Sequence, residues 1–454
     1  MNKFSNLNLS KEMLLNLDKI GYSAMTTIQK ESLPLILDNQ DIIAQAKTGS
    51  GKTAAFGIGL LNKLDVKKFR VQTLVLCPTR ELADQVAKEL RILAKFAHNI
   101  KILTLVGGAS FGQQLGSLRH QAHIIVGTPG RVLKHLDKET LTLDNLDMLV
   151  FDEADRMLDM GFIEEIEKVV AFTPRERQTL LFSATYPEEI LQLSKKFQKD
   201  AHFVKTESME TVNKINEKFY SVESKEKFQT LVNIFSDENP ENSIVFCNTK
   251  VQTDELAKEL QDKNIDALAL HGDMEQYDRN DVLVQFSNRS ARVLVATDVA
   301  ARGLDIKELA MVVNYDLPHS METYTHRIGR TGRAGAEGVA VTLYSDYEEE
   351  KIAEYKNDTR QFKQSDVLIL ENRFEMKPYN VTLVIEGGKK DKLRAGDLLG
   401  ALTAKDGLKG TSIGKIDIYD RQSYVAIERK FIKDAQKKLS DGKIKNKNFS
   451  VWIL

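Results

Sequence analysis

The chain has 454 residues, of which 42% are hydrophobic and 28% are charged. These proportions are ordinary for globular proteins and argue against fibrous or largely disordered structure, and the length favours about three domains. No apolar run approaches the ~20 residues of a membrane helix, and the first residues lack the apolar core of a signal peptide, so we expect a cytoplasmic protein without a membrane partner. Cys77 and Cys247 lie in apolar segments and are expected to be reduced core thiols.

Charge is unevenly distributed along the chain. Residues 376–454 contain 17 lysines and arginines and 9 acidic residues, a net charge of +8, whereas the whole chain carries −1. Residues 1–375 therefore carry −9. A basic module attached to an acidic body indicates an anionic partner, most often nucleic acid, although charged segments also occur simply as solvated surfaces.

Short apolar segments alternate with longer amphipathic stretches through most of the chain. Runs of about 4–8 residues rich in Val, Ile and Leu that alternate in this way indicate buried parallel strands joined by helices. The first series of predicted strands is Asp41–Ala46, Thr73–Cys77, Lys101–Val106, His123–Val126, Met148–Phe151 and Gln178–Phe182. The second series is Ser243–Cys247, Asp266–Leu270, Ala291–Ala296, Ala310–Asn314 and Gly338–Leu343.

The second series repeats features of the first. The segment Thr73–Thr79 resembles Ser243–Thr249 at an offset of 170 residues, and residues of the following stretch match at the same offset. We therefore predict an α/β fold with two tandem lobes, each a parallel sheet covered by helices. The first lobe is placed at residues 1–207 and the second at residues 208–370, with a hinge around Lys205–Thr211.

Residues 376–454 have a different pattern, which predicts a small α+β domain. The order strand, helix, strand, strand, helix, strand is the ferredoxin-like topology of RNA-recognition modules. Trp452, the single tryptophan, is expected in the core of the last strand. The predicted elements are Val381–Ile385, Ala395–Thr403, Ile413–Ile418, Tyr424–Ile427, Phe431–Leu439 and Phe449–Leu454.

The sharpest local motif is a glycine-containing segment between a predicted strand and a predicted helix. It reads Ala46-Lys47-Thr48-Gly49-Ser50-Gly51-Lys52-Thr53. Small residues allow backbone N–H groups to surround phosphate oxygens, and the helix N-terminus adds partial positive charge. Lys52 is expected to bind the β- and γ-phosphates, and Thr53 to bind Mg²⁺. The motif predicts a nucleotide triphosphate site, although Ala46 stands where the general pattern has glycine.

Two further predicted strands end in residues that suit phosphate chemistry. The fifth strand runs into Asp152-Glu153-Ala154-Asp155. Asp152 is placed to bind Mg²⁺, partly through water, and Glu153 is placed to orient and deprotonate the attacking water. Ser183 and Thr185, after the sixth strand, are candidates for coupling the phosphate site to the second lobe, although an ordinary strand end has the same composition.

The second lobe has no phosphate loop but contains an arginine-rich segment. It reads His326-Arg327-Ile328-Gly329-Arg330-Thr331-Gly332-Arg333. Arginines at this spacing suit a clamp on the oxygens of a phosphoryl group in its transition state. A salt-bridged surface helix or a nucleic-acid patch are the alternatives. The predicted strand Ala291–Ala296 is followed by the segment that ends at Asp305. In that segment, Gly303 and Asp305 are candidate nucleotide contacts, and Asp305 is placed to accept hydrogen bonds from a ribose.

Together these blocks resemble the DEAD-box family of ATP-dependent RNA helicases, over nearly the whole chain. The resemblance implies two RecA-like lobes, ATP and Mg²⁺ as cofactors, and RNA-stimulated ATP hydrolysis. The module at 376–454 resembles the RNA-binding domain of DbpA-type members of the family. Besides the motifs above, the matching segments are Pro78–Ala83, Gly107-Gly108, Thr128–Arg131, Asp397–Thr403 and Ile413–Ile416.

The resemblance implies specific roles around the nucleotide. Tyr22 would stack on the adenine and Gln29 would read its hydrogen-bonding edge, with Phe4 supporting Tyr22. Arg330 and Arg333 would contact the γ-phosphate as arginine fingers.

These roles divide the catalytic residues between the two lobes. Lys52 and Glu153 belong to the first lobe and the two arginine fingers to the second, so hydrolysis would require the lobes to close. His326 would couple the lobes, and Arg327 would have a structural or coupling role.

RNA would contact both lobes and the basic module. Contacts in the lobes would go mainly to phosphates and 2′-hydroxyls. The implied residues are Pro78, Thr79, Arg80, Gly108, Thr128, Arg131, Gly272, Arg279 and Thr297 in the lobes, and Lys389, Lys390, Lys392, Arg394, Lys443, Lys445 and Lys447 in the module.

The resemblance to DbpA-type proteins implies a specific RNA partner, namely a hairpin of 23S ribosomal RNA of the large subunit and pre-ribosomal particles. The implied process is ribosome assembly. The strand Tyr424–Glu428 lacks the two stacking aromatics of common RNA-recognition modules, so we expect a helix or loop surface of the module to bind.

Three alternatives stay open at this stage. An RNA-binding scaffold with a vestigial ATPase would lack one of Lys52, Glu153, Arg330 and Arg333, and all four are present. A DNA helicase of the same design would be stimulated equally by single-stranded DNA. The basic module could serve dimerisation, although its charge favours RNA and nothing in the sequence requires more than a monomer.

Overall fold

The computed structural model describes residues 3–46, 49–186, 188–206, 215–301, 309–332, 337–356, 359–365, 374–404 and 407–454. The chain divides into two units, which are Met1–Glu210 with Gly303–Asp305, and Thr211–Arg302 with Ile306–Leu454. None of the described helices is both long and apolar enough to span a membrane. The predicted hinge falls mostly on residues 207–214, which lie outside the described part.

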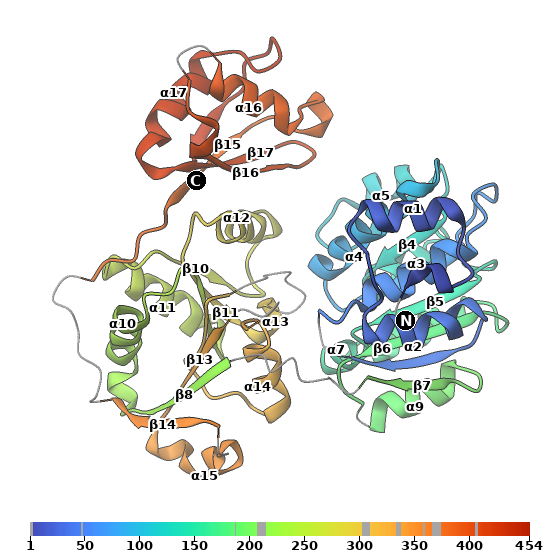
Figure 1. Cartoon of the computed structure of the whole chain (residues 1–454), viewed down its shortest axis with the longest axis horizontal. Helices are drawn as coiled ribbons and strands as arrows, with labels where there is room; N and C mark the ends of the chain where they lie inside the picture. The colour runs from blue at the N-terminus through green and yellow to red at the C-terminus, as the bar shows by residue number, and fades with distance from the viewer. Residues whose placement is uncertain are drawn as a thin grey trace. The chain divides into compact units, whose positions relative to one another are not determined.

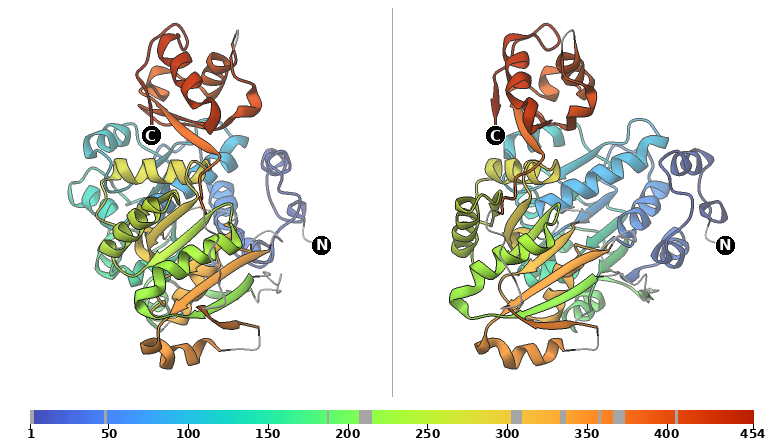
Figure 2. Two further views of the ribbon diagram at one scale, coloured as in Figure 1. Left: turned by 90° about the vertical axis from the view of Figure 1, so that its left-hand side faces the viewer. Right: turned by 60° about the vertical axis from the view of Figure 1, so that its left-hand side comes forward.

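The first unit is a seven-stranded parallel sheet with helices on both faces (Figures 1 and 2). Its strand order is β3-β4-β2-β5-β6-β1-β7. The strands are β1 Ile42–Gln45, β2 Thr73–Leu76, β3 Ile102–Leu105, β4 Ile124–Gly127, β5 Met148–Asp152, β6 Gln178–Ser183 and β7 His202–Lys205. The helices are α1 Lys11–Lys19, α2 Thr27–Leu37, α3 Lys52–Lys63, α4 Arg80–Leu93, α5 Phe111–Leu118, α6 Pro129–Asp137, α7 Ala154–Asp159, α8 Ile163–Ala171 and α9 Glu188–Phe197.

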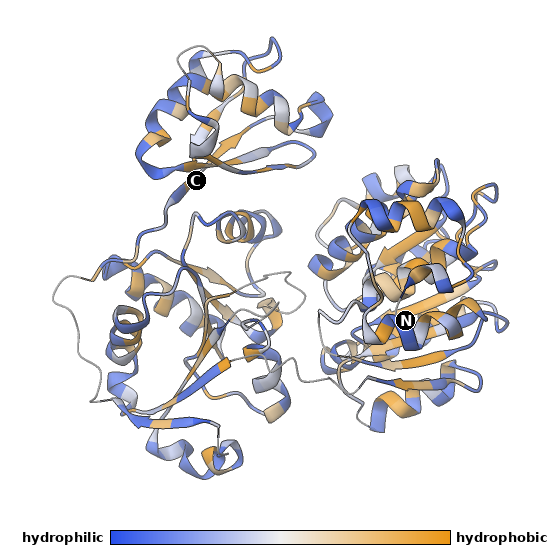
Figure 3. Ribbon diagram, viewed as in Figure 1, coloured by the Kyte–Doolittle hydropathy of each residue, from blue (hydrophilic) through white to orange (hydrophobic). Residues whose placement is uncertain are grey.

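Alternate residues of the central strands enter two separate cores, one on each face of this sheet. In β1, Ile42 and Ala44 join one core whereas Ile43 joins the other. In β5, Val150 lies in the first core and Leu149 in the second. Because both faces are buried, the strands are apolar throughout rather than alternating with polar residues, as the hydropathy colouring shows (Figure 3). This explains why these strands could be recognised in the sequence.

The first part of the second unit repeats this topology. Its sheet has the order β10-β11-β9-β12-β13-β8-β14, which is the order of the first sheet with every strand number raised by seven. The predicted duplication of lobe design is confirmed. The strands are β8 Ile215–Ser221, β9 Ser243–Cys247, β10 Ala267–Leu270, β11 Val293–Thr297, β12 Met311–Asn314, β13 Gly338–Tyr344 and β14 Gln361–Gln364. The helices are α10 Lys227–Glu238, α11 Lys250–Asp262, α12 Gln276–Ser287, α13 Asp298–Ala301, α14 Met321–Ile328 and α15 Glu349–Ile352.

Residues 380–453 form the predicted ferredoxin-like domain. A four-stranded antiparallel sheet has the order β16-β17-β15-β18. Its apolar core lies between one face of the sheet and two helices. The elements are β15 Asn380–Ile385, α16 Ala395–Thr403, β16 Ile413–Ile418, β17 Ser423–Glu428, α17 Ile432–Asp441 and β18 Val451–Ile453.

Helix α12 covers the other face of this small sheet. The Tyr424 hydroxyl donates a hydrogen bond to Asp281 Oδ1 at 2.7 Å, and Val284 packs on Val384 and Tyr424. Asn288 Nδ2 donates to Thr382 Oγ1 at 2.9 Å. Residues 281, 284 and 288 share one helix face, and successive even-numbered residues of β15 and β17 point to this face of the sheet.

The expectation for Trp452 requires a correction. Trp452 lies in the last strand, as predicted, but it packs with Val284, Val384 and Tyr424 on the face covered by α12 and not in the core of its own domain. The sequence of one domain cannot show this, because the partner surface belongs to another.

Removal of the Tyr424 hydroxyl provides a test of this packing. Tyr424→Phe leaves the buried Asp281 carboxylate without its donor, so we expect a loss of about 1 kcal/mol in the free energy of unfolding. Trp452, the single tryptophan, packs beside Tyr424, and its fluorescence during urea unfolding reports this region. Tyr347→Phe, at a 94% exposed ring, is the control. Equal urea midpoints for Tyr424→Phe and wild type would contradict the assignment.

Candidate nucleotide and RNA site

Three neighbouring strands of the first unit bring the predicted phosphate residues to one edge of the sheet. The loop 46–51 follows β1, Asp152 ends β5, and Ser183 ends β6. Parallel strands point the same way, so their carboxyl ends share one edge. Ala46 N donates to the Ser183 carbonyl at 3.0 Å, which ties the start of the loop to the end of β6.

The phosphate loop ends at Gly51, which caps helix α3. Gly51 has φ +94°, in the left-handed region that favours glycine, and a Cβ there would lie 2.5 Å from Gln29 Nε2. Lys52 is buried, and its ammonium group donates to the Ala46 carbonyl at 2.7 Å. The buried Ser50 Oγ has no hydrogen-bond partner among the described residues. An unsatisfied hydroxyl, an ammonium group and a helix N-terminus together fit a phosphate group. Lys47 and Thr48 lie outside the described residues.

The residues predicted around the adenine lie beside this loop. Gln29 is buried; its Oε1 accepts from Thr26 N at 2.9 Å, and its Nε2 donates to the Gly51 carbonyl at 3.2 Å. An amide side chain has two donor hydrogens and two acceptor lone pairs, so one of each is left for a base. Phe4 makes an edge contact with Tyr22 at a ring-centre distance of 6.3 Å. Burial and the neighbouring Glu89 raise the pKa of Tyr22 to about 12, so its hydroxyl stays protonated.

The two acidic residues predicted for catalysis have different environments. Asp152 is buried, and burial together with the neighbouring Glu153 raises its pKa to about 7, against the effect of Lys52. Glu153 has φ +55°, which is uncommon outside glycine, and its carboxylate forms a buried ion pair with Arg156 at 2.8 Å. Strained backbone of this kind is concentrated at functional sites.

Asp155 joins the ends of β5 and β6. Its Oδ2 accepts hydrogen bonds from Ala184 N, Thr185 N and Thr185 Oγ1 at 3.2, 3.0 and 2.9 Å, and Asp155 N donates to Ser183 Oγ at 3.2 Å. Burial acts to raise the pKa of Asp155, but the hydrogen bonds with Ser183 and Thr185 and the nearby Lys52 hold it below its usual value. Ser183 and Thr185 thus bind the acidic motif within the first unit, and their predicted coupling role stays a prediction.

The predicted RNA residues of the first unit lie at the adjoining part of the same edge. Pro78, Thr79 and Arg80 follow β2, Gly108 follows β3, and Thr128 to Arg131 follow β4. These three strands are neighbours in the sheet. Helices α4 and α6 begin here, and their N-terminal N–H groups are suited to phosphates. The predicted nucleotide and RNA residues of this unit therefore occupy adjacent stretches of one edge.

A buried polar network holds Arg131, and sequence reasoning missed it. Arg131 Nη1 donates to Gln114 Oε1 at 2.8 Å and to the Ala109 carbonyl at 3.0 Å. His135 Nε2 also bonds to Gln114 Oε1, at 3.0 Å, and Thr140 Oγ1 lies 2.8 Å from the other ring nitrogen. Burial, with Arg131 and Lys134 nearby, lowers the pKa of His135 to about 4, so its ring is neutral and Nε2–H is the donor. A single glutamine and a single histidine carry no motif, so nothing in the sequence marked them.

In the second unit, the predicted RNA residues lie near the ends of β10 and β11. Gly272 follows β10, Thr297 ends β11, and Arg279 lies on α12, where its Nη1 donates to the His271 carbonyl at 3.1 Å. Of the arginine-rich segment, His326 lies in α14 and the buried Arg330 follows it. Gly303, Asp305 and Arg333 lie outside the described residues, so their predicted roles stay predictions.

Arg327 has a structural role in the second unit. It is 1% exposed, and its Nε and Nη2 donate to both carboxylate oxygens of Asp298 at 2.7 and 2.6 Å. The remaining donors bond to Asn314 Oδ1, the Asp316 carbonyl and Asn248 Oδ1. All five N–H groups of the guanidinium are thus satisfied.

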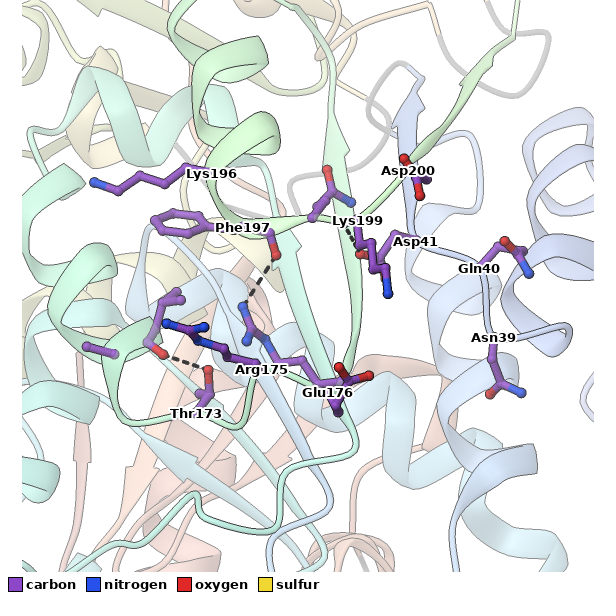
Figure 4. Close-up of a pocket in the computed structure, with 14 residues that line it drawn as sticks. Asn39, Gln40, Asp41, Thr173, Arg175, Glu176, Lys196, Phe197, Lys199 and Asp200 are labelled. Atoms are coloured by element: carbon purple, nitrogen blue, oxygen red, sulfur yellow. Dashed lines mark hydrogen bonds between the residues drawn. The ribbon is translucent and has the colours of Figure 1, made fainter.

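A cavity of about 820 Å³ in the first unit is unrelated to this edge (Figure 4). Its lining includes Asp41, Arg177 and Asp200. Asp41 and Arg177 immediately precede β1 and β6, and Asp200 lies shortly before β7, so all three are at the amino ends of the strands. Asp41 accepts hydrogen bonds from Thr179 N and Lys199 N at 2.6 and 2.8 Å. The cavity therefore lies at the edge of the sheet opposite to the phosphate loop.

Comparison with known proteins agrees with this arrangement. Residues 26–193 match the DEAD/DEAH box helicase family, residues 226–335 the helicase conserved C-terminal domain, and residues 382–453 the DbpA RNA-binding domain. The ATP-dependent RNA helicase DbpA of Escherichia coli (strain K12) is 50% identical over 463 aligned residues, with all of both chains covered. The chain belongs to the DEAD-box RNA helicases of the DbpA type. It is therefore an ATP-dependent RNA helicase.

Further relatives of this helicase support the same assignment. The ATP-dependent RNA helicase DbpA of Bacillus subtilis (strain 168) is 39% identical, with 94% of each chain covered. Among solved structures, S. cerevisiae Dbp5 bound to RNA and ADP BeF3 has a TM-score of 0.72 at 32% identity and covers 81% of this chain and 96% of its own. Mss116p bound to ssRNA and AMP-PNP has a TM-score of 0.70 at 28% identity, covering 78% and 77%. The RecA-like fold predicted for the two lobes of this helicase is thus confirmed.

The structural role of Arg327 can be tested separately from catalysis. Arg327→Met leaves Asp298 without its bidentate partner, so we expect a loss of about 3 kcal/mol in the free energy of unfolding. Arg289→Met removes an exposed ion pair with Glu241 and is the matched control, with an expected loss below about 1 kcal/mol. Urea unfolding measures both. A stable Arg327→Met protein that lacks only ATPase activity would contradict the structural role.

The catalytic role of Glu153 can be tested by a charge-neutral variant. We expect Glu153→Gln to bind nucleotide like the wild type and to lose turnover by about 100-fold, because an amide does not accept the proton of water. The measurement is RNA-stimulated ATPase together with the affinity for a fluorescent ATP analogue. Glu164→Gln, with an 85% exposed side chain, is the control. Turnover at the wild-type rate would remove Glu153 from the mechanism.

Proposed function

We propose that this helicase locally separates short duplexes in structured RNA, and that its RNA is large-subunit (23S) ribosomal RNA during ribosome assembly in the cytoplasm. Two observations together carry the proposal. The predicted ATP and RNA residues lie along the carboxyl edge of a sheet in the helicase lobes, and a further basic domain matches the DbpA RNA-binding domain. A separate RNA-binding domain suits a helicase that acts at one place on a large RNA. A monomer is sufficient for this activity.

The proposed chemistry assigns one task to each group of the site. Lys52 and the N–H groups of the loop bind the phosphates, and Thr53 and Asp152 would hold Mg²⁺, which would neutralise phosphate charge. Glu153 orients water and accepts its proton. Arg330 and Arg333 stabilise the charge of the transition state. Because these groups come from both units, RNA and ATP binding are expected to favour the same active conformation.

The ferredoxin-like domain of residues 380–453 is called the small domain below. Its RNA contacts are proposed to lie on its basic loops. Helix α12 and Trp452 occupy the sheet face that common RNA-recognition modules use for base stacking. Two basic segments, 389–394 and 443–447, lie together on another side: Lys445 Nζ donates to the Lys392 carbonyl at 2.8 Å and lies 3.6 Å from an Asp397 carboxylate oxygen. Because α12 covers the sheet face, its position supports the expectation that RNA binds a loop surface of the domain.

The proposal predicts that the basic loops select the RNA. We expect the full chain with Lys389→Ala, Lys390→Ala, Lys443→Ala and Lys447→Ala to lose the stimulation of ATPase by ribosomal RNA while keeping that by a homopolymer RNA. Neutralising the exposed Lys433 and Lys437 of α17 is the control within the same domain. The affinity of the quadruple variant should depend less on salt, by up to about one counterion per lost phosphate contact.

The same ATPase assay separates the proposal from its rivals. Equal stimulation by ribosomal and homopolymer RNA in the wild type would remove the support for a ribosomal target. Equal stimulation by single-stranded DNA would favour a DNA helicase. An absence of hydrolysis with every nucleic acid would favour a binding scaffold.

A further inference from the structure

Two half-exposed tyrosines lie where α12 meets the small domain. Tyr277, at the start of α12, is 49% exposed, and Tyr419, in the turn between β16 and β17, is 43% exposed. Both are large rings, and neither contributes to the apolar clusters of its own domain among the described residues. Exposed aromatic rings on a nucleic-acid-binding protein are suited to stacking on bases.

The two tyrosines are joined by a short set of contacts. Gln422 Nε2 donates to the Tyr277 hydroxyl at 2.9 Å, and Gln422 Oε1 lies 3.2 Å from the Tyr424 hydroxyl, which donates to Asp281. Tyr419 packs edge-on against Tyr424, with ring centres 5.5 Å apart and planes at 83°. Tyr424 is itself buried. These contacts hold the neighbourhood in place, so a base that stacks there orders few side chains.

Basic segments flank the tyrosines on the side of the small domain. Lys389 N donates to the Tyr419 carbonyl at 2.8 Å, and Lys390 N donates to the Asp420 carbonyl at 3.0 Å. The segment 389–392 therefore adjoins the turn that carries Tyr419. Lys445 contacts the end of that segment through the Lys392 carbonyl. The tyrosines thus continue the surface that the proposed function assigns to RNA.

The proposed RNA path of the lobe approaches from the other side. Gly272 lies in the segment between β10 and α12, and Tyr277 lies in the first turn of α12. Lys250 forms an ion pair with Asp273 at 2.5 Å. It also lies beside Gly272, because a Cβ added at Gly272 would be 3.9 Å from Lys250 Cε. Along the surface, the order is therefore Gly272, Tyr277, Tyr419 and the basic segment.

We propose that Tyr277 and Tyr419 form a stacking site for bases of single-stranded RNA, which connects the strand bound by the lobe to the element bound by the small domain. The site rests on the proposed function, because it extends the two RNA surfaces assigned there. Stacking on tyrosine depends little on base identity, so the site recognises the single strand and not its sequence.

Binding of short and long RNA to the full chain tests the site. The probes are single-stranded RNAs of mixed sequence, of about 6 and about 16 nucleotides, which span the range that single-strand-binding folds accommodate. Affinity is measured by fluorescence anisotropy in the presence of AMP-PNP. We expect Tyr277→Ala with Tyr419→Ala to weaken binding of the long strand by about fivefold or more. Binding of the short strand, which the lobes hold, should be unchanged.

Matched variants separate stacking from other effects. Tyr277→Phe with Tyr419→Phe keeps both rings and should bind the long strand like the wild type. Tyr347→Ala removes an equally large exposed ring elsewhere in the second unit and should have no effect. Thermal unfolding of each variant controls for stability.

The outcomes separate this site from the proposed function. Wild-type affinity of the double alanine variant for the long strand would overturn the stacking site. Equal weakening for both strands would overturn it in favour of a structural role. If the wild type binds neither strand, the proposed function itself fails.

Discussion

The carboxyl edge of a parallel sheet is the constraint on which this structure depends. Every strand of such a sheet delivers the chain to the same edge, and seven parallel strands deliver seven loops to it. Strands β1, β5 and β6 bring the phosphate loop, Asp152 and Ser183 together, and the adjoining β2, β3 and β4 bring the predicted RNA residues beside them. Contacts such as those of Asp155 and Gln114 then fix these groups relative to one another. The predicted ATP and RNA residues therefore share one edge of the sheet.

Duplication extends this constraint to the second lobe, but the second lobe uses its edge differently. It has the same strand order and no phosphate loop. Its arginine-rich segment carries the predicted fingers, and within that segment Arg327 is fully used in holding Asp298, Asn314 and Asn248. Arg327 thus has a structural role, whereas the roles predicted for Arg330 and Arg333 in the same motif stay predictions.

The small domain shows how packing decides which surface is left for RNA. Its sheet face is occupied by α12, through Val284, Val384 and the bond between Tyr424 and Asp281. The proposed RNA surface therefore lies on loops of this domain, where the lysines and Tyr419 lie, and continues to Tyr277 on α12. The buried carboxylate of Asp281 keeps this arrangement specific, because an unsatisfied charge at that place would be costly.

Much of the fold could be predicted, and the exceptions have physical causes. Central strands with both faces buried are continuously apolar, whereas β7, β8 and β14 were missed because edge and near-edge positions leave polar residues such as those of His202–Lys205 and Gln361–Gln364 exposed. The phosphate loop and the acidic motif follow from spacing along the chain. The roles of Gln114, His135 and Trp452 depend on contacts between distant segments, which no local pattern encodes.

The most direct test of the account is the linkage between nucleotide and RNA binding. The measurement is the affinity of the full chain for a single-stranded RNA with and without AMP-PNP, together with the affinity for AMP-PNP with and without that RNA. The account predicts that each ligand tightens the other by the same factor, of about 5–150-fold. An affinity for RNA that is the same with and without AMP-PNP would contradict it.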